Sequence, residues 1–73
     1  MKAPRFVLCI SNHDYEVSLV RRKIYQLVDD QRAETHGQLR VIDESGDDYL
    51  FPAELFISLE LPAEVRERLL TPA

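Results

Sequence analysis

Residues 39–61 read LRVIDESGDDYLFPAELFISLEL and hold the clearest structural signals in the chain. Two apolar runs flank a short polar segment that contains Gly46, and this composition is typical of a tight hairpin turn. We therefore expect one strand over residues 39–43 and another over residues 48–51, joined by that turn. Pro52 follows, which cannot donate to a sheet ladder and readily starts a helical turn.

A half-buried strand is expected after this turn, because residues 57–61 alternate between apolar and polar side chains. Pro62 ends that strand and opens a helix over residues 63–70. Val65 and Leu69 lie four residues apart and therefore share one face of the helix. We expect this face to plug one end of the folded body.

The first half of the chain predicts two more strands and a long loop. Residues 5–11 are short and apolar on both faces, which indicates a strand covered on both sides for part of its length. Residues 11–16 are polar and typical of the start of a long loop, and residues 20–28 hold a second run of strand-forming side chains. The connection at residues 29–37 has room for one helical turn, with an aspartate as its cap and Gly37 as its terminator.

Length and composition predict one small domain over residues 1–73. The chain is 45% hydrophobic and 30% charged, as in ordinary folded domains. A domain of this size buries only about 60% of the surface that its unfolded chain exposes. The single cysteine excludes a disulfide within the chain and fits a reducing compartment. No stretch has the length of a signal-peptide core or a membrane span, so we expect a cytoplasmic protein.

Charge is unevenly distributed along the chain. Residues 1–28 carry a net charge of +3, residues 29–73 carry −7, and the whole chain carries −4. An acidic protein repels nucleic acid, whose binding rests on the neutralisation of phosphates. The local run Arg21-Arg22-Lys23 nevertheless offers an alternative hypothesis, in which Arg5 and this run bind nucleic acid.

No group of residues in the sequence has the spacing of a catalytic or metal site. Cys9 lies inside an apolar strand, where burial raises the pKa of a thiol and makes it a poor nucleophile. His13 and His36 fall in polar loops and do not have the spacing of zinc ligands. The acidic segment at residues 43–48 lacks the twelve-residue pattern of an EF-hand calcium loop. We therefore expect no metal, no cofactor and no enzymatic activity.

The succession of strands, turn and Pro-led helical turn resembles the Src homology 3 type of small barrel over residues 5–61. The most specific stretch is YLFPAELF at residues 49–56. The resemblance implies a mainly β, five-stranded barrel with a short C-terminal helix over about residues 62–70, as in short stand-alone bacterial proteins of this shape. Those domains bind proline-rich peptides on an aromatic shelf. This chain has no tryptophan, and Leu55 stands where the family has a ligand-contacting tyrosine, so Pro52 is the groove residue that carries over.

Our leading functional hypothesis is a non-enzymatic module that binds another protein. The expected contact surface joins the long loop to the residues near the hairpin turn and comprises Asp14, Tyr15, Asp47, Asp48 and Pro52. Two alternatives stay open beside it. One is nucleic-acid binding through the patch Arg21, Arg22 and Lys23, and the other is a homodimer formed by pairing of open strand edges.

Overall fold

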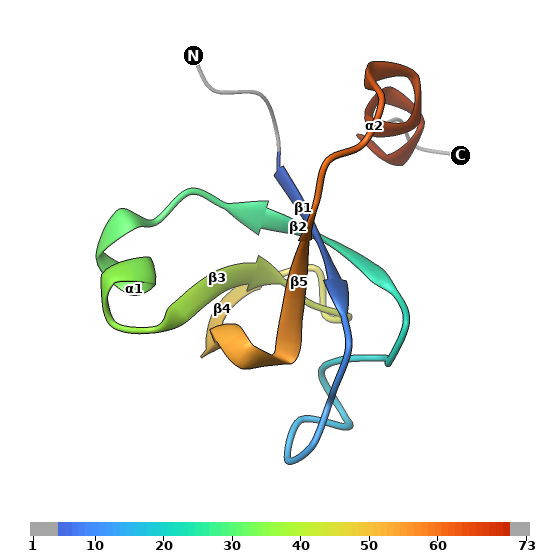
Figure 1. The fold of residues 1–73 in the computed structure, drawn as a ribbon. Helices are drawn as coiled ribbons and strands as arrows, with labels where there is room; N and C mark the ends of the chain where they lie inside the picture. Colours follow the sequence, from blue (N-terminus) through green and yellow to red (C-terminus); the bar gives the residue numbers. More distant parts are fainter. Residues whose placement is uncertain (1–4, 71–73) are drawn as a thin grey trace.

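A computed structural model of the chain describes residues 5–70, so residues 1–4 and 71–73 of the predicted domain lie outside the described part. The described chain contains five strands, two short α-helices and one 3₁₀ turn (Figure 1). In chain order they are β1 (Arg5–Cys9), β2 (Ile24–Val28), α1 (Gln31–Thr35), β3 (Gln38–Ile42), β4 (Asp48–Pro52), η1 (Ala53–Leu55), β5 (Phe56–Leu59) and α2 (Ala63–Leu70). The mainly β class is therefore confirmed.

The five strands form one antiparallel sheet with the order β4-β3-β2-β1-β5. The first and last strands are neighbours, because Phe6 of β1 lies opposite Leu59 of β5. Within residues 5–70, β4 and β5 are the two edges of the sheet, and no ladder joins them. The sheet curves in Figure 1 but is not closed by hydrogen bonds, so the predicted closed barrel is not confirmed.

One face of the sheet holds the hydrophobic core. Alternate residues of the strands point into it, and two anchors come from outside the strands: Leu19 of the β1–β2 connection and Leu55 of η1. The buried members are Val7, Cys9, Leu19, Tyr25, Leu27, Val41, Phe51, Leu55 and Phe56. Because a strand alternates its side chains between faces, β1 and β2 turn their other residues to the opposite face.

Two sequence expectations need correction. The second strand begins at Ile24 rather than at residue 20, because residues 20–23 form a turn in which Arg22 has a φ of 67°. A non-glycine residue in this left-handed region interrupts a strand. The C-terminal helix forms as predicted, but it does not plug the body, since no residue of α2 is buried.

The two glycines terminate local elements as expected. Gly37 follows α1 with a φ of 74°, and Gly46 closes the β3–β4 turn with a φ of 87°. The aspartate cap of α1 is Asp30, whose carboxylate accepts the Ala33 N–H at 3.0 Å. In the β3–β4 turn the Gly46 N–H donates to the Asp43 carbonyl at 3.0 Å. These contacts position β3 and β4 for the site described below.

Replacing Gly46 by alanine should lower the free energy of unfolding by about 1 kcal/mol, because a β-carbon disfavours the left-handed backbone. No other atom lies within 4 Å of the position such a carbon would take, so the cost is expected to come from the backbone alone. Urea denaturation monitored by circular dichroism measures the change. Gly46→Asn is the control, since asparagine tolerates this conformation better and should restore part of the loss. Equal stability of Gly46→Ala and the parent chain would contradict this account.

Candidate functional site

The connection between β1 and β2 is a long loop that folds back on itself. The N–H groups of Ser18 and Leu19 both donate to the Tyr15 carbonyl, at 3.0 and 2.9 Å. The Asn12 side chain donates to the Leu19 carbonyl at 3.0 Å, and Leu19 is fully buried in the core. The loop is therefore an ordered platform, and these bonds hold Tyr15 in a defined position.

Tyr15 packs against the aromatic residues of the core. Its ring meets Phe51 edge to face, with 5.4 Å between centroids and an interplanar angle of 78°. Phe51 in turn meets Phe56 in the same manner at 6.1 Å. Offset and edge-to-face geometries are the favourable ones for aromatic pairs. Tyr15 is half-buried at the rim of this cluster, and one part of its ring is open to solvent.

One groove runs between the long loop and η1, and we call it the Pro52 groove. Its volume is about 350 Å³, and its lining residues are Ser11, His13, Asp14, Tyr15, Pro52, Glu54 and Leu55. The exposed carboxylates of Asp14 and Glu54 give it an acidic rim. Within residues 5–70, Glu54 has no ion-pair partner, and Asp14 has only the His13 ring at 3.7 Å.

A second groove lies on the other side of Tyr15, and we call it the Tyr49 groove. It has a volume of about 350 Å³ and is lined by Tyr15, Ser18, Asp43, Ser45, Tyr49, Leu50 and Phe51. Tyr49 is 51% exposed, and the core is reached two residues further along the strand, at Phe51. Tyr15 therefore stands between two grooves of similar size.

The structure brings three of the five predicted partner-binding residues together. Asp14, Tyr15 and Pro52 all line the Pro52 groove. Asp47 and Asp48 line neither groove. Asp47 lies in the β3–β4 turn, where its carbonyl accepts the Asp43 N–H at 3.0 Å.

Asp48 belongs to a separate charge cluster centred on Arg40. The Arg40 guanidinium contacts Asp30 at 2.8 Å and Asp48 at 3.1 Å. The pKa of Asp30 is lowered, first by the N–H of Ala33 and then by Arg40. The same two carboxylates raise the pKa of Arg40. This cluster ties the cap of α1 to β3 and β4 and leaves Asp48 engaged with its own chain.

The predicted basic patch contains an internal ion pair. Lys23 Nζ lies 2.6 Å from a Glu44 carboxylate oxygen and 5.5 Å from the centre of the Tyr25 ring. This lysine, followed by the Tyr25 hydroxyl, lowers the pKa of Glu44. Only Arg21 and Arg22 of the patch are exposed without an ion pair in the described part of the chain. A neighbouring carboxylate weakens the attraction of such a patch for phosphate.

The candidate reactive side chains Cys9, His13 and His36 lie in different environments. Cys9 is fully buried, its thiol donates to the Ser11 carbonyl at 3.3 Å, and burial raises its pKa. His13 is exposed in the long loop, whereas a ring nitrogen of His36 lies 2.8 Å from the Arg32 carbonyl at the end of α1. Across residues 5–70 no three His, Cys, Asp or Glu side chains gather in a metal-binding arrangement. No helix in the same range has the length and apolar character needed to cross a membrane.

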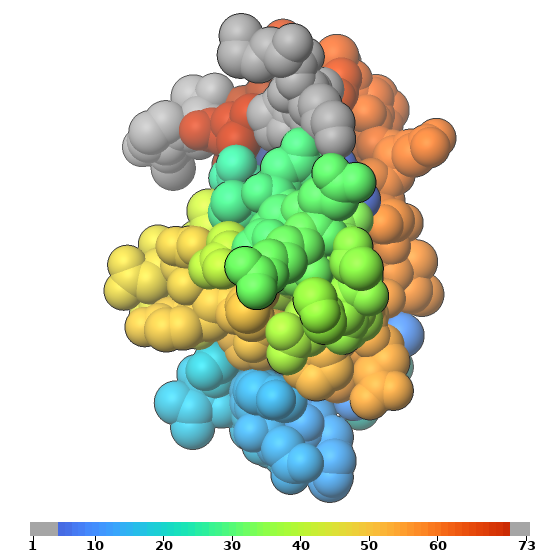
Figure 2. All heavy atoms as spheres, turned by 90° about the vertical axis from the view of Figure 1, so that its left-hand side faces the viewer, coloured from blue at the N-terminus to red at the C-terminus, as the bar shows by residue number. Residues whose placement is uncertain are grey.

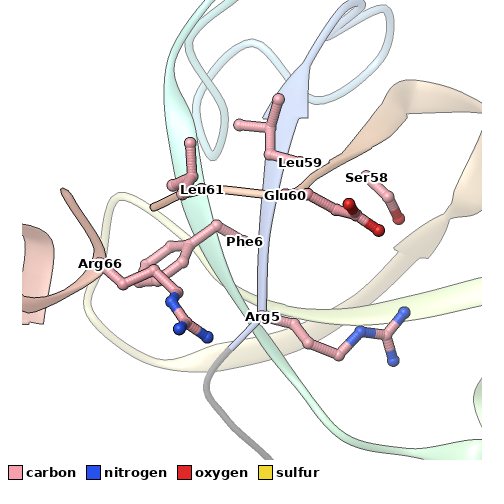
Figure 3. A pocket seen from close by; sticks show the side chains of 7 residues that line it. All are labelled: Arg5, Phe6, Ser58, Leu59, Glu60, Leu61 and Arg66. Atoms are coloured by element: carbon pink, nitrogen blue, oxygen red, sulfur yellow. The ribbon is translucent and has the colours of Figure 1, made fainter. Parts of the chain in front are cut away.

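A third hollow, of about 370 Å³, lies where β1 and β5 meet the start of α2 (Figure 3). Its lining residues are Arg5, Phe6, Ser58, Leu59, Glu60, Leu61 and Arg66. The Arg5 guanidinium is held by Asp29 at 3.3 Å and Glu34 at 3.4 Å. Figure 3 shows Arg66 beside the Phe6 ring, while the Arg5 side chain extends away from it. The hollow mixes both signs of charge and has no single electrostatic character.

No protein-family model matches the chain, and neither a curated protein nor a solved structure gives a match. The function is therefore argued from the geometry of the chain itself. The two grooves present an aromatic edge, apolar walls and free carboxylates, and this combination suits non-covalent binding of a partly apolar, partly basic ligand.

Proposed function

We propose that this protein is a non-enzymatic module that binds an extended segment of another protein across the Pro52 and Tyr49 grooves. The observation that carries the proposal is the place of Tyr15, a half-buried aromatic residue shared by two grooves of about 350 Å³ each. Aromatic side chains that are already held by packing lose little conformational entropy on binding and are frequent anchors of interfaces. An extended peptide that crosses Tyr15 fills one groove on each side.

The lining of the grooves indicates the chemistry of the ligand. The Tyr49 groove offers Tyr49, Leu50 and Phe51, which suit an apolar or aromatic side chain. The Pro52 groove offers the carboxylates of Asp14 and Glu54, which suit a lysine or arginine. The expected ligand therefore has an apolar residue and a basic residue a few positions apart, in an extended conformation.

The arrangement of the grooves supports the resemblance to Src homology 3 domains. The resemblance rests on the strand order β4-β3-β2-β1-β5, the long β1–β2 loop and the 3₁₀ turn before β5. Such domains bind peptides between the long loop and the 3₁₀ turn, which is where the Pro52 groove lies. This chain has no tryptophan, and Leu55 is buried, so we expect a ligand that depends less on proline.

Other functions receive less support from the described residues. The raised pKa of Cys9 is the opposite of what a nucleophilic thiol needs. The ion pair of Lys23 with Glu44 removes one of three cations from the patch that would contact nucleic acid. A single free thiol fits a reducing environment, and we place the module in the cytoplasm.

Reversal of charge in the Pro52 groove should weaken peptide binding without unfolding the domain. Peptides are first selected from a displayed random library with the full chain, and their affinities are measured by fluorescence anisotropy. Glu54→Lys is expected to raise the Kd of a basic selected peptide by about tenfold, because like charges then oppose each other. Glu54 is exposed and makes no ion pair in residues 5–70, so this change removes no contact of the fold.

Asp47→Lys is the matched control, because Asp47 is an exposed acid that lines neither groove. It changes the net charge by the same amount and should alter the Kd by less than about twofold. An equal loss of affinity in both variants would indicate general electrostatic attraction. Amide shifts induced by the peptide away from Tyr15, on ¹⁵N-labelled protein, would place the binding site elsewhere.

A further inference from the structure

The face of the sheet opposite the core is also apolar. In the pairing of β1 with its two neighbours, Phe6 lies between Gln26 and Leu59. One step along the same face, Leu8 lies between Ile24 and Ile57. Five of these six positions are therefore apolar, and we call the set the outer face: Phe6, Leu8, Ile24, Ile57 and Leu59.

The outer face is covered at one end and open at the other. Phe6 is only 5% exposed although it is not part of the core cluster, and Leu61 and Arg66 lie beside it (Figure 3). In the other row Leu8 and Ile24 are half-buried, and Ile57 is 51% exposed. The exposed part of this apolar surface therefore lies around Ile57.

Helix α2 also has apolar side chains that no other part of the chain covers. None of its residues is buried, and Val65, Leu69 and Leu70 are each at least 40% exposed. Figure 1 shows α2 beyond the end of the sheet, reached by the segment that follows β5. Isolated helices shorter than about 12–15 residues are marginal in water, so a helix of 8 residues needs a surface on which to pack.

We infer that a second copy of this chain covers the outer face, with α2 of each copy lying across the row Leu8, Ile24 and Ile57 of the other. A helix on one face of a sheet is a standard stable layer, and each chain has one such helix and one such uncovered row. In a dimer with two-fold symmetry, the helix of each chain covers the row of the other, so the same contact forms twice. Figure 2 shows the long loop at the opposite end of the molecule from the red C-terminal segment, and the outer face shares no residue with the two grooves.

The distribution of charge is compatible with this dimer. The chain carries a net charge of −4, which makes two copies repel each other at most surfaces. Helix α2 is the exception, because it holds two acids and two arginines, and the row that receives it has no charged side chain. The exposed apolar residues that this interface brings together are Ile57 on the sheet and Val65, Leu69 and Leu70 on the helix.

Sedimentation velocity of the full chain at several concentrations tests the dimer directly. We expect a species of twice the 8.5 kDa chain mass that dissociates on dilution. Ile57→Asp and Leu69→Asp should each raise the dissociation constant by at least about tenfold. Val17→Asp is the control, since Val17 is 97% exposed in the long loop and should leave the constant unchanged. A monomer at all concentrations would overturn the inference.

Cysteine cross-linking identifies which surfaces meet. Two separate variants, Ile57→Cys and Leu69→Cys, are mixed under mild oxidation, while the buried Cys9 thiol serves as an internal check in the parent chain. A disulfide-linked heterodimer of the two variants is the expected product. A further variant carries both substitutions in one chain. A disulfide that forms within this chain, and not between the two single variants, would mean that α2 folds back on its own sheet, which contradicts the exchange. A dimer that forms without either cross-link would point to pairing of the free edges of β4 or β5 and would equally overturn it.

This inference and the proposed function can fail independently. The outer face and the two grooves share no residue. Ile57→Asp should therefore abolish the dimer and leave the Kd for a selected peptide within about twofold of the parent value. A dimer retained in this variant would overturn the inference, whereas loss of peptide binding from a folded variant would count against the independence of the two sites.

Discussion

Replacement of Phe51 by alanine should bring the domain close to complete unfolding at room temperature. Phe51 is 3% exposed and meets both Tyr15 and Phe56 edge to face. Phenylalanine-to-alanine changes in a core cost about 3–5 kcal/mol. A chain of this length has a total stability of about 4–11 kcal/mol, and a small domain with a thin core is expected near the lower value, so one such loss removes most of it.

Urea denaturation followed by circular dichroism gives the stability of each variant. Tyr49→Ala is the matched control, because Tyr49 lies on the same face of β4 but is half exposed. It should cost less than about 1 kcal/mol. Phe51→Leu keeps the fold and loses the aromatic contact with Tyr15, and we expect weaker peptide binding from it. Equal losses of stability in Phe51→Ala and Tyr49→Ala would show that the core extends to Tyr49 and does not end at Phe51.

The second large effect is expected at alkaline pH and depends on Tyr25. The Tyr25 hydroxyl donates to Glu44 at 2.6 Å and accepts the Val20 N–H at 2.8 Å. Burial first, and then the hydrogen bond to Glu44, raises the pKa of Tyr25 from 10.0 to about 12. Because the folded state holds this proton more tightly than the unfolded state, the contribution is fully present below pH 10. It is lost as the pH rises from 10 to about 12, and it amounts to about 2–3 kcal/mol.

Stability measured by urea titration between pH 8 and 12 should therefore fall steeply above pH 10 in the parent chain. Tyr25→Phe should be less stable at neutral pH, since the Val20 N–H loses its acceptor, but should show a much shallower alkaline fall. Tyr49→Phe should keep the steep fall, because Tyr49 is half exposed. An unchanged pH profile in Tyr25→Phe would assign the alkaline transition to other groups.

The local elements were readily predicted because each depends on residues adjacent in sequence. Gly46 and its polar neighbours produced the hairpin, and Pro52 produced the 3₁₀ turn. The start of β2 was wrong by four residues, since Val20 and the charged side chains at residues 21–23 gave no sign of the left-handed backbone at Arg22. Local strand propensity does not predict where β2 begins, because the preceding loop, which Leu19 anchors in the core, sets the direction of the chain at this point.

The packing of whole elements was less accessible from the sequence. The amphipathic pattern of α2 predicted a buried face, but a pattern cannot say which surface covers it. The apolar residues on both faces of β1 were noted, and the structure explains them through the outer face. Closure of the sheet depends on the relative twist of β4 and β5, which no local signal specifies.

The candidate site was predicted only in part, because its residues come together through the packing of separate elements. Asp14, Tyr15 and Pro52 lie in segments that the sheet topology brings together, and they share a groove. Asp48 was placed with them on sequence proximity to the turn, but it lies at the opposite end of β4 from Pro52 and pairs with Arg40. The contribution of Glu54 had no sequence signal beyond its place after Pro52.

The pairing of β1 with β5 has a consequence for the order in which the protein matures on the ribosome. β1 is synthesised first, yet one of its two edges stays without a partner until residues 56–59 have been made. Strands β2, β3 and β4 can assemble on the other side of β1 earlier, because all three precede β5 in the sequence. During synthesis the nascent chain therefore presents an unpaired, apolar strand edge, of the kind that chaperones recognise and that promotes aggregation.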